Sequence, residues 1–167
     1  ALIDAQNSGI ITSGKIELVI SNKPGAYALT RAENAGIKTA VINNKEYAKR
    51  EDFEAQVKAV LQENGTELII LAGFMCILSK DFTDRYVNRI INVHPALIPS
   101  FCGEGFYGLK VHEKALEYGV KVTGATVHFV NEIADGGKII MQKAVNVKEG
   151  DTPEILQKRV MEQAEWK

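Results

Sequence analysis

Asn92 and His94 are the residues of this sequence whose types and spacing best fit catalysis. They stand two positions apart at the end of a predicted strand, residues 89–93, so an extended backbone directs both side chains to the same face. An amide beside an imidazole suits a reaction that develops negative charge on a carbonyl oxygen, because the amide donates to that oxygen while the imidazole donates or shuttles a proton. Pro95 and Pro99 stiffen the chain that follows. A hydrogen-bonded, purely structural histidine is the alternative that this spacing leaves open.

Asp135 is a second candidate, in a polar loop with Gly136 and Gly137, which let the backbone approach a planar ligand closely. An ordinary turn aspartate is the alternative. His128 alternates with apolar residues in a strand, which predicts a packed or sheet-surface side chain, and His112 in a helical segment is predicted to be solvent-exposed. Because three dispersed histidines lack a carboxylate cluster, we expect no catalytic metal. Without a GxSxG, Walker or complete GxGxxG motif, a nucleophilic serine or a nucleotide hydrolase has no support.

The elements that must position these residues alternate between strand-length apolar runs and segments of helical period. Strands are predicted over residues 15–21, 38–42, 67–72, 89–93, 122–130 and 138–147. Helices are predicted over residues 1–6, 25–35, 50–64, 80–86 and 110–118, and from Pro153 to the end of the chain. The run 67–72 is almost wholly apolar, which is typical of a strand buried on both faces.

Strand-helix-strand repeats of this length predict an α/β fold, a doubly wound and mostly parallel Rossmann-like sheet with an antiparallel C-terminal strand. Ligands of such a fold bind beyond the carboxyl ends of the strands. Three segments with unusual content follow strands there: residues 72–78, 91–99 and 131–137. No repeat or linker is apparent, so a single domain over residues 1–167 is predicted.

The composition narrows the class of protein. Lys and Arg total 20 against 21 for Asp and Glu, so a nucleic-acid partner bound through bulk positive charge is not expected. No apolar run approaches the roughly 20 residues that cross a bilayer, and no secretory leader is visible, so no membrane partner is expected. The two cysteines, Cys76 and Cys102, show no ligand spacing. They argue against a disulfide framework or a structural zinc and favour a reducing cytoplasm.

Five short motifs fall in the order, and at nearly the spacing, of one known family. They are ISNK at 20–23, LAGFM at 71–75, NVHP at 92–95, TVHFV at 126–130 and DGG at 135–137. On these motifs the chain resembles the folate-dependent glycinamide ribonucleotide formyltransferases over essentially its whole length. The Asn-x-His-Pro motif alone is shared with other folate formyltransferases, whereas the five motifs together are highly specific.

The resemblance implies formyl transfer from 10-formyltetrahydrofolate to the amino group of glycinamide ribonucleotide in purine biosynthesis, without a metal. Asn92 and His94 match the residues that steady the oxyanion and handle the proton. Asp135 matches the carboxylate that pairs with this histidine and favours its imidazolium form. The cofactor-binding positions that the resemblance implies are Arg50, Met75, Cys76, Ile77, Leu78, Asn92, Asn131, Glu132, Ile133, Ala134 and Asp135. The implied substrate-binding positions are Gln163, Ala164 and Glu165.

The chain departs from this family in three places. Cys76 stands where many relatives carry arginine, and the loop 102–110 is longer than in many relatives, so the equivalence of His112 is in doubt. The family's N-terminal strand and glycine-rich phosphate loop have no counterpart, and the last helix stops without a cap, so we expect a domain truncated at both ends. A protein without that loop should bind the substrate phosphate poorly and turn over little.

Three other functions stay open at this point, and the oligomeric state is not determined. A formyltetrahydrofolate hydrolase uses similar residues, but commonly carries a second histidine where Pro95 stands and an N-terminal regulatory domain. A methionyl-tRNA formyltransferase would call for a further C-terminal domain and a basic surface. A folate-binding module without catalysis would explain the missing phosphate loop, but not the presence of Asn92, His94 and Asp135 together.

Overall fold

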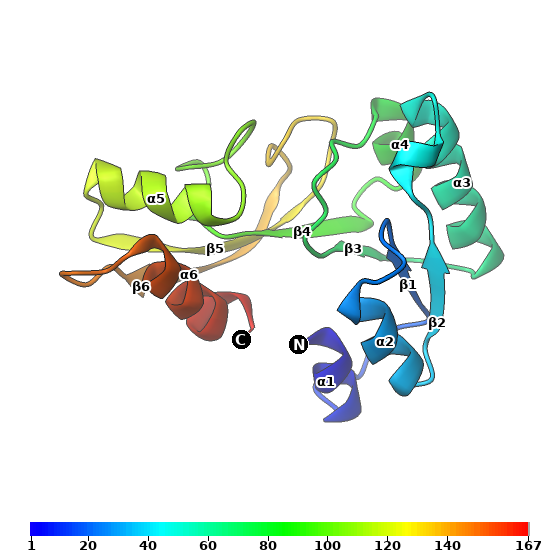
Figure 1. The fold of residues 1–167 in the computed structure, drawn as a ribbon, viewed down its shortest axis with the longest axis horizontal. Helices are drawn as coiled ribbons and strands as arrows, with labels where there is room; N and C mark the ends of the chain where they lie inside the picture. Colours follow the sequence, from blue (N-terminus) through cyan, green and yellow to red (C-terminus); the bar gives the residue numbers. More distant parts are fainter. Residues whose placement is uncertain (167) are drawn as a thin grey trace. The chain divides into compact units, whose positions relative to one another are not determined.

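The computed structural model describes residues 1–166 and divides the chain into two compact units, Ala1–Glu67 and Leu68–Lys167 (Figure 1). Each unit combines helices with its own sheet. Among the described residues, no helix has the length and apolar character that crossing a bilayer requires.

The first unit is built on two parallel strands. Its elements are α1 (Leu2–Asn7), β1 (Leu18–Ser21), α2 (Tyr27–Asn34), β2 (Lys38–Val41), the 3-10 turn η1 (Asn44–Glu46) and α3 (Arg50–Glu63). Strands β1 and β2 pair in parallel, with Leu18 opposite Lys38, and α2 packs on both strands. All of these elements except the short η1 were predicted.

The predicted apolar faces of the helices explain this packing. In α2, Leu29 and Ala32 are buried, whereas Ala35, predicted on the same face, lies beyond the last turn and is exposed. In α3, Phe53 and Leu61 are buried as their spacing of eight residues requires.

The second unit contains a four-stranded mixed sheet. Its elements are β3 (Ile69–Leu71), α4 (Lys80–Arg85), β4 (Ile90–His94), α5 (Leu109–Tyr118), β5 (Val122–Phe129), β6 (Ile139–Asn146), α6 (Pro153–Val160) and the π-helical turn η2 (Met161–Glu165). The strand order is β3-β4-β5-β6, parallel between β3 and β4 and antiparallel in the other two pairs. The predicted α/β fold, parallel first and antiparallel at its C-terminal end, is confirmed.

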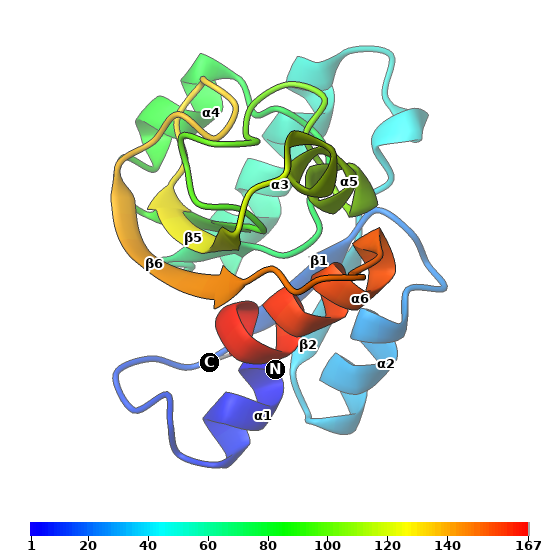
Figure 2. The same cartoon turned by 90° about the vertical axis from the view of Figure 1, so that its left-hand side faces the viewer.

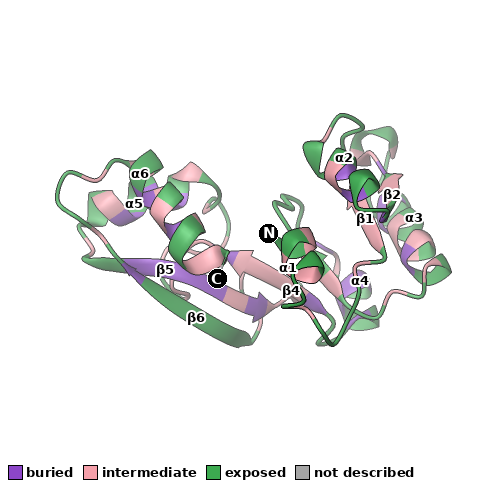
Figure 3. Ribbon diagram, turned by 90° about the horizontal axis from the view of Figure 1, so that it is seen from below, coloured by how far each residue is buried: buried purple, intermediate pink, exposed green. Residues whose placement is uncertain are grey.

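The core of the second unit lies between β5 and the helices α5 and α6. Ala125, Val145, Leu156 and Val160 form a buried cluster, and Ala164 packs against it from η2. Helices α5 and α6 contact each other and α6 contacts β5. Figure 3 shows both helices on one face of the sheet, with β5 mostly buried and β6 mostly exposed.

One expectation about the sheet is wrong. The strand predicted over residues 67–72 was expected to be buried on both faces, but β3 spans only three residues and Ile70 is 42% exposed. The reason is position: β3 is an edge strand of its sheet and pairs with β4 alone. An apolar run therefore indicated a strand here without indicating how much of it would be covered.

The last helix begins where the sequence predicts. The Thr152 side chain accepts a hydrogen bond from the backbone N–H of Ile155, and Pro153 occupies the first turn. Just before it, a hydrogen bond from the Arg159 guanidinium lowers the pKa of Asp151 to about 2. The helix widens into the π-helical turn η2 rather than continuing regularly, and Lys167 lies outside the described residues.

His112, predicted to be exposed, is fully buried on the inner side of α5. Neither of its ring nitrogens has a hydrogen-bond partner among residues 1–166. Burial, with a smaller contribution from the nearby His94, lowers the pKa of His112 from 6.5 to about 4. The folded protein therefore holds this ring neutral across the physiological range.

This burial predicts how the free energy of unfolding depends on pH. Below pH 6.5 the unfolded chain gains a proton on His112 that the folded chain accepts only near pH 4. Between these two pH values the free energy of unfolding of wild type should therefore fall by roughly 2–3 kcal/mol because of this one group. Below the lower pH, His112 should cause no further loss. In His112→Leu, an apolar side chain of similar size, that loss should vanish, and near neutral pH the variant should be at least as stable because no hydrogen bond is removed.

Urea denaturation of both proteins across this pH range measures the difference, and groups common to both cancel. If the free energies of unfolding of wild type and His112→Leu changed with pH in parallel, the folded protein would accept a proton on His112 and the prediction would be wrong.

Candidate active site

Strands β4 and β5 place three polar side chains at the centre of the second unit. Asn92 and His94 lie two residues apart at the end of β4. The antiparallel register sets Asn92 opposite His128 of β5, and residues directly opposite each other point to the same face of a sheet. A contact between Asn92 and His128 is thus built into the strand pairing.

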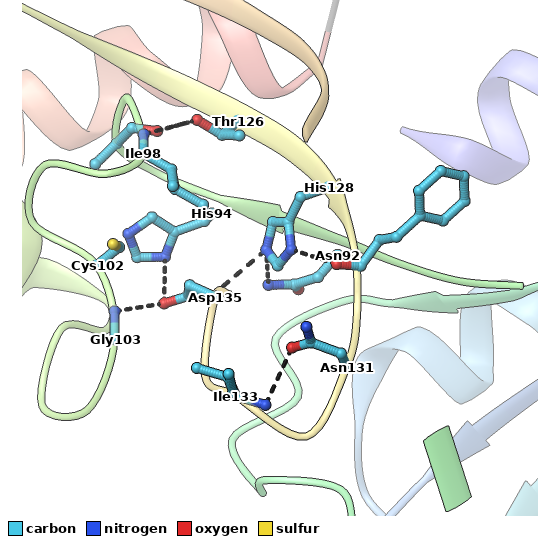
Figure 4. Close-up of polar contacts among 12 residues, drawn as sticks. Asn92, His94, Ile98, Cys102, Gly103, Thr126, His128, Asn131, Ile133 and Asp135 are labelled. Atoms are coloured by element: carbon cyan, nitrogen blue, oxygen red, sulfur yellow. Dashed lines mark hydrogen bonds and ion pairs between the residues drawn. The ribbon is translucent and has the colours of Figure 1, made fainter. Parts of the chain in front are cut away.

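His94 is held at both ring nitrogens. Its Nε2 lies 2.8 Å from the carbonyl oxygen of Phe101. Its Nδ1 lies 3.4 Å from Oδ2 of Asp135 (Figure 4). A carbonyl can only accept, so Nε2 must carry a proton. A second proton on Nδ1 then gives an imidazolium facing a carboxylate, whereas the neutral ring would point a lone pair at it. Nδ1 can therefore donate to the carboxylate only when it carries a proton as well.

The carboxylate of Asp135 is largely shielded from water and has polar neighbours at both of its oxygens. Its Oδ2 accepts a hydrogen bond of 2.9 Å from the backbone N–H of Gly103, and its Oδ1 lies 3.6 Å from Nε2 of His128. Burial alone would raise the pKa of Asp135, but the polar surroundings of the carboxylate, including the N–H of Gly103 and the charge of His94, outweigh it and lower that pKa. The carboxylate is therefore kept in its charged form.

His128 belongs to this cluster, although the sequence indicated only a packed or sheet-surface histidine. It is 1% exposed, and its Nδ1 lies 2.9 Å from the carbonyl oxygen of Phe129. Its Nε2 lies 3.3 Å from Nδ2 of Asn92. The sequence signal that could have found it is the alternation within β5, but only together with the register to β4, which one sequence does not give.

The loop before α5 supplies the cluster with backbone atoms. Phe101 and Gly103 contribute a carbonyl oxygen and an N–H, while Cys102 between them donates its thiol to the carbonyl of Pro99. Burial, and next to it the negative charge of Asp135, raises the pKa of the Cys102 thiol. Figure 4 shows this thiol beside the His94 ring.

A cavity of about 140 Å³ lies next to the loop that carries Asp135. Thr83 and Asp84 of α4 line it together with Asn131 and Glu132 of the loop, which lies beside α4 in Figure 2. The side chain of Asn131 also accepts from the backbone N–H of Ile133 and so braces the loop. Two of the residues expected to bind a cofactor, Asn131 and Glu132, thus line a cavity.

The segment after β3 presents apolar side chains to solvent. Met75 is 64% exposed and Ile77 49%, and Cys76 is exposed as well, whereas Leu78 is buried. Exposed apolar side chains in sequence are typical of a ligand-binding or interaction surface. The segment therefore fits the flat ring that the resemblance implies.

The remaining sequence-predicted site residues lie elsewhere. Arg50 begins α3 in the first unit, where its Nε lies 3.9 Å from Oε1 of Glu54. Gln163, Ala164 and Glu165 form part of η2, which packs against β5 and β6. Burial raises the pKa of Glu165 above its usual range. Ala164 packs against the buried cluster of the second unit.

Among residues 1–166 no group of three or more His, Cys, Asp or Glu side chains is arranged to hold a metal ion. The cluster consists of hydrogen-bond donors and one carboxylate converging on a small volume. Such an arrangement can stabilise an oxyanion and exchange a proton.

Comparison with known proteins agrees with this chemistry. A family described as formyl transferase matches residues 1–167. The chain is 51% identical over 148 residues to a trifunctional purine biosynthetic protein adenosine-3 of Gallus gallus, a match that covers 89% of this chain but 14% of that protein. It is 41% identical over 162 residues to a phosphoribosylglycinamide formyltransferase of Haemophilus influenzae, covering 97% of this chain and 74% of the relative.

A solved structure shows the same fold. Glycinamide ribonucleotide transformylase 1 from Symbiobacterium toebii superposes with a TM-score of 0.88 at 41% identity, over 96% of this chain and 73% of that one. This chain spans about one seventh of the trifunctional relative and about three quarters of the two bacterial proteins.

Gly137 offers a test of how the loop is held. A Cβ at this position would overlap the backbone carbonyl oxygen of Phe129, which also holds Nδ1 of His128. We expect Gly137→Ala to lower the free energy of unfolding by about 1–3 kcal/mol, because the backbone must shift to relieve the overlap. Gly14→Ala is the matched control, since a Cβ there meets nothing within 4 Å. Equal stabilities of the two variants in chemical denaturation would contradict the described path of the loop.

Proposed function

The chain belongs to the formyl transferase family, and we propose that it forms the catalytic part of an enzyme that transfers a formyl group from 10-formyltetrahydrofolate to the amino group of glycinamide ribonucleotide. This reaction is a step of purine biosynthesis, and we infer a cytoplasmic setting. The observation that supports the proposal best is the contact of His94 with Asp135 beside Asn92, at the end of β4.

The proposed chemistry uses these three side chains in distinct ways. A C–N bond forms between the substrate amine and the formyl carbon, the bond from that carbon to the folate nitrogen breaks, and the amine proton ends on the folate nitrogen. Asn92 donates to the formyl oxygen as negative charge develops there. His94, kept protonated by Asp135, adds its positive charge and exchanges the proton. Because burial excludes water, each of these interactions is stronger than at a surface.

Binding of the two substrates is proposed at separate surfaces. The exposed side chains of Met75 to Ile77 and the loop 131–135 would hold the flat ring of the folate, whose formyl group then supplies the reacting carbonyl. Gln163 and Glu165 would contact the ribonucleotide, the latter with a carboxyl whose pKa burial raises.

The direct test offers 10-formyltetrahydrofolate either with glycinamide ribonucleotide or with water alone and follows release of tetrahydrofolate. We expect release that depends on the ribonucleotide, and its loss in His94→Ala while folate binding is largely kept. Release with water alone would instead make the protein a hydrolase. Folate binding without release under either condition would make it a binding module.

Asp135→Asn isolates the charge of the carboxylate. Asp135 has a positive φ of 53°, a backbone conformation that asparagine tolerates well, so the variant should fold. Without the negative charge His94 loses the partner of its Nδ1 proton, and kcat should fall by roughly 10²–10⁴-fold. Glu117→Gln, which neutralises an exposed carboxylate in α5, is the control and should keep wild-type kcat. An Asp135→Asn variant within a few-fold of that control would remove Asp135 from the mechanism.

A further inference from the structure

We propose that His128 is a positioning residue, which as a neutral imidazole holds the Asn92 amide in the orientation that offers an N–H to the reacting carbonyl. The inference rests on the proposed function and deepens it. It starts from the contact of 3.3 Å between Nε2 of His128 and Nδ2 of Asn92. Figure 4 shows His128 between Asn92 and Asp135.

The contact made by Nδ1, the other ring nitrogen of His128, shows which nitrogen carries the proton. Nδ1 lies 2.9 Å from the carbonyl oxygen of Phe129, which can only accept, so Nδ1 carries the proton. In the neutral ring Nε2 then has a lone pair and can only accept. Its neighbour Nδ2 of Asn92 is a donor, so the two atoms match.

A charged His128 fits this site poorly. With protons on both nitrogens, Nε2 would turn a donor towards the amide donor of Asn92. The opposite charge near Nε2 is Oδ1 of Asp135 at 3.6 Å, and this carboxylate already faces Nδ1 of His94 at 3.4 Å. One carboxylate cannot offset two imidazolium ions that are almost completely buried. The positive charge therefore belongs to His94, and His128 stays neutral.

An accepting Nε2 on His128 determines which end of the Asn92 amide points towards it. A half-turn of the amide exchanges its oxygen and its nitrogen at little intrinsic cost. With the oxygen towards Nε2 of His128, two lone pairs would face each other and a hydrogen bond would be lost. With the nitrogen there, one N–H is engaged by His128 and the second stays free for the formyl oxygen.

The strand register fixes this arrangement in the folded protein. Asn92 and His128 are direct cross-strand neighbours in β4 and β5, so their contact does not depend on a loop. Phe129, whose carbonyl sets the tautomer, is the last residue of the same strand β5. A donor fixed before the substrate arrives needs no reorganisation as charge develops, which is the condition for strong oxyanion stabilisation.

Two substitutions at His128 separate its two nitrogens. Gln is long enough to place an accepting oxygen near the position of Nε2, whereas Asn reaches only the position of Nδ1. We expect His128→Asn to lower kcat about tenfold or more, the effect of one hydrogen bond in the transition state, with little change in KM for the folate. His128→Gln should retain clearly more kcat. Equal losses in both variants, or a loss confined to KM, would overturn the proposal.

A double-mutant cycle shows whether the effect passes through Asn92. In an Asn92→Ala background, His128→Asn should have almost no further effect on kcat, because the amide that it positions is gone. If the double variant instead lost kcat by the product of the two single losses, the positioning role would be overturned. Chemical denaturation of each variant reports stability separately, so a folding defect is seen as such.

The tautomer can be measured without any activity. In protein labelled with ¹⁵N-histidine, the resonances of His128 are identified by their absence in His128→Gln, and the chain has only 3 histidines. Near neutral pH we expect a proton on Nδ1 and none on Nε2. An Nε2–H tautomer or an imidazolium would overturn the proposal even if the variants fold poorly. If wild type transfers no formyl group, the proposed function fails, while this measurement still decides the state of His128.

Discussion

The carboxylate of Asp135 is only 14% exposed, and the arrangement of the second unit follows from the need to compensate it. A charge taken out of water is stable only when hydrogen-bond donors or opposite charges replace the solvent. Here they come from His94 at the end of β4 and the backbone N–H of Gly103 before α5. One buried charge thereby connects two loops to the sheet. Each donor is also what keeps the carboxylate ionised, so structure and chemistry share the same contacts.

The two histidines around this carboxylate differ although their surroundings look alike. Each has one ring nitrogen on a backbone carbonyl, from Phe101 or Phe129, and the other directed at Asp135. Nδ1 of His94 faces Oδ2 of Asp135. Nε2 of His128 has in addition Nδ2 of Asn92 as a neighbour, 3.3 Å away. In the roles proposed above, this single amide on the opposite strand separates an acid from a fixed acceptor.

The loop before α5 contacts the site through backbone atoms rather than side chains. It contacts His94 and Asp135 through the carbonyl of Phe101 and the N–H of Gly103, which are atoms that every residue other than proline supplies. The side chain of Cys102 turns instead to the carbonyl of Pro99. A change of side chain at Phe101 or Gly103 therefore leaves these backbone atoms in place.

The sequence by itself determined the local elements and the nature of the chemistry. Periodicity placed Phe53 and Leu61 on one face of α3, Thr152 and Pro153 marked the start of α6, and the spacing of Asn92 and His94 indicated a carbonyl reaction. These features depend on neighbours within one or two turns or along one strand. Only the tertiary structure decided the burial of His112 and the contacts of His128, and it brought Asp135 to His94 as the resemblance implied. Burial of a helix face, the register between strands and the meeting of two loops each depend on segments distant in the chain, and local spacing does not encode which of them will come together.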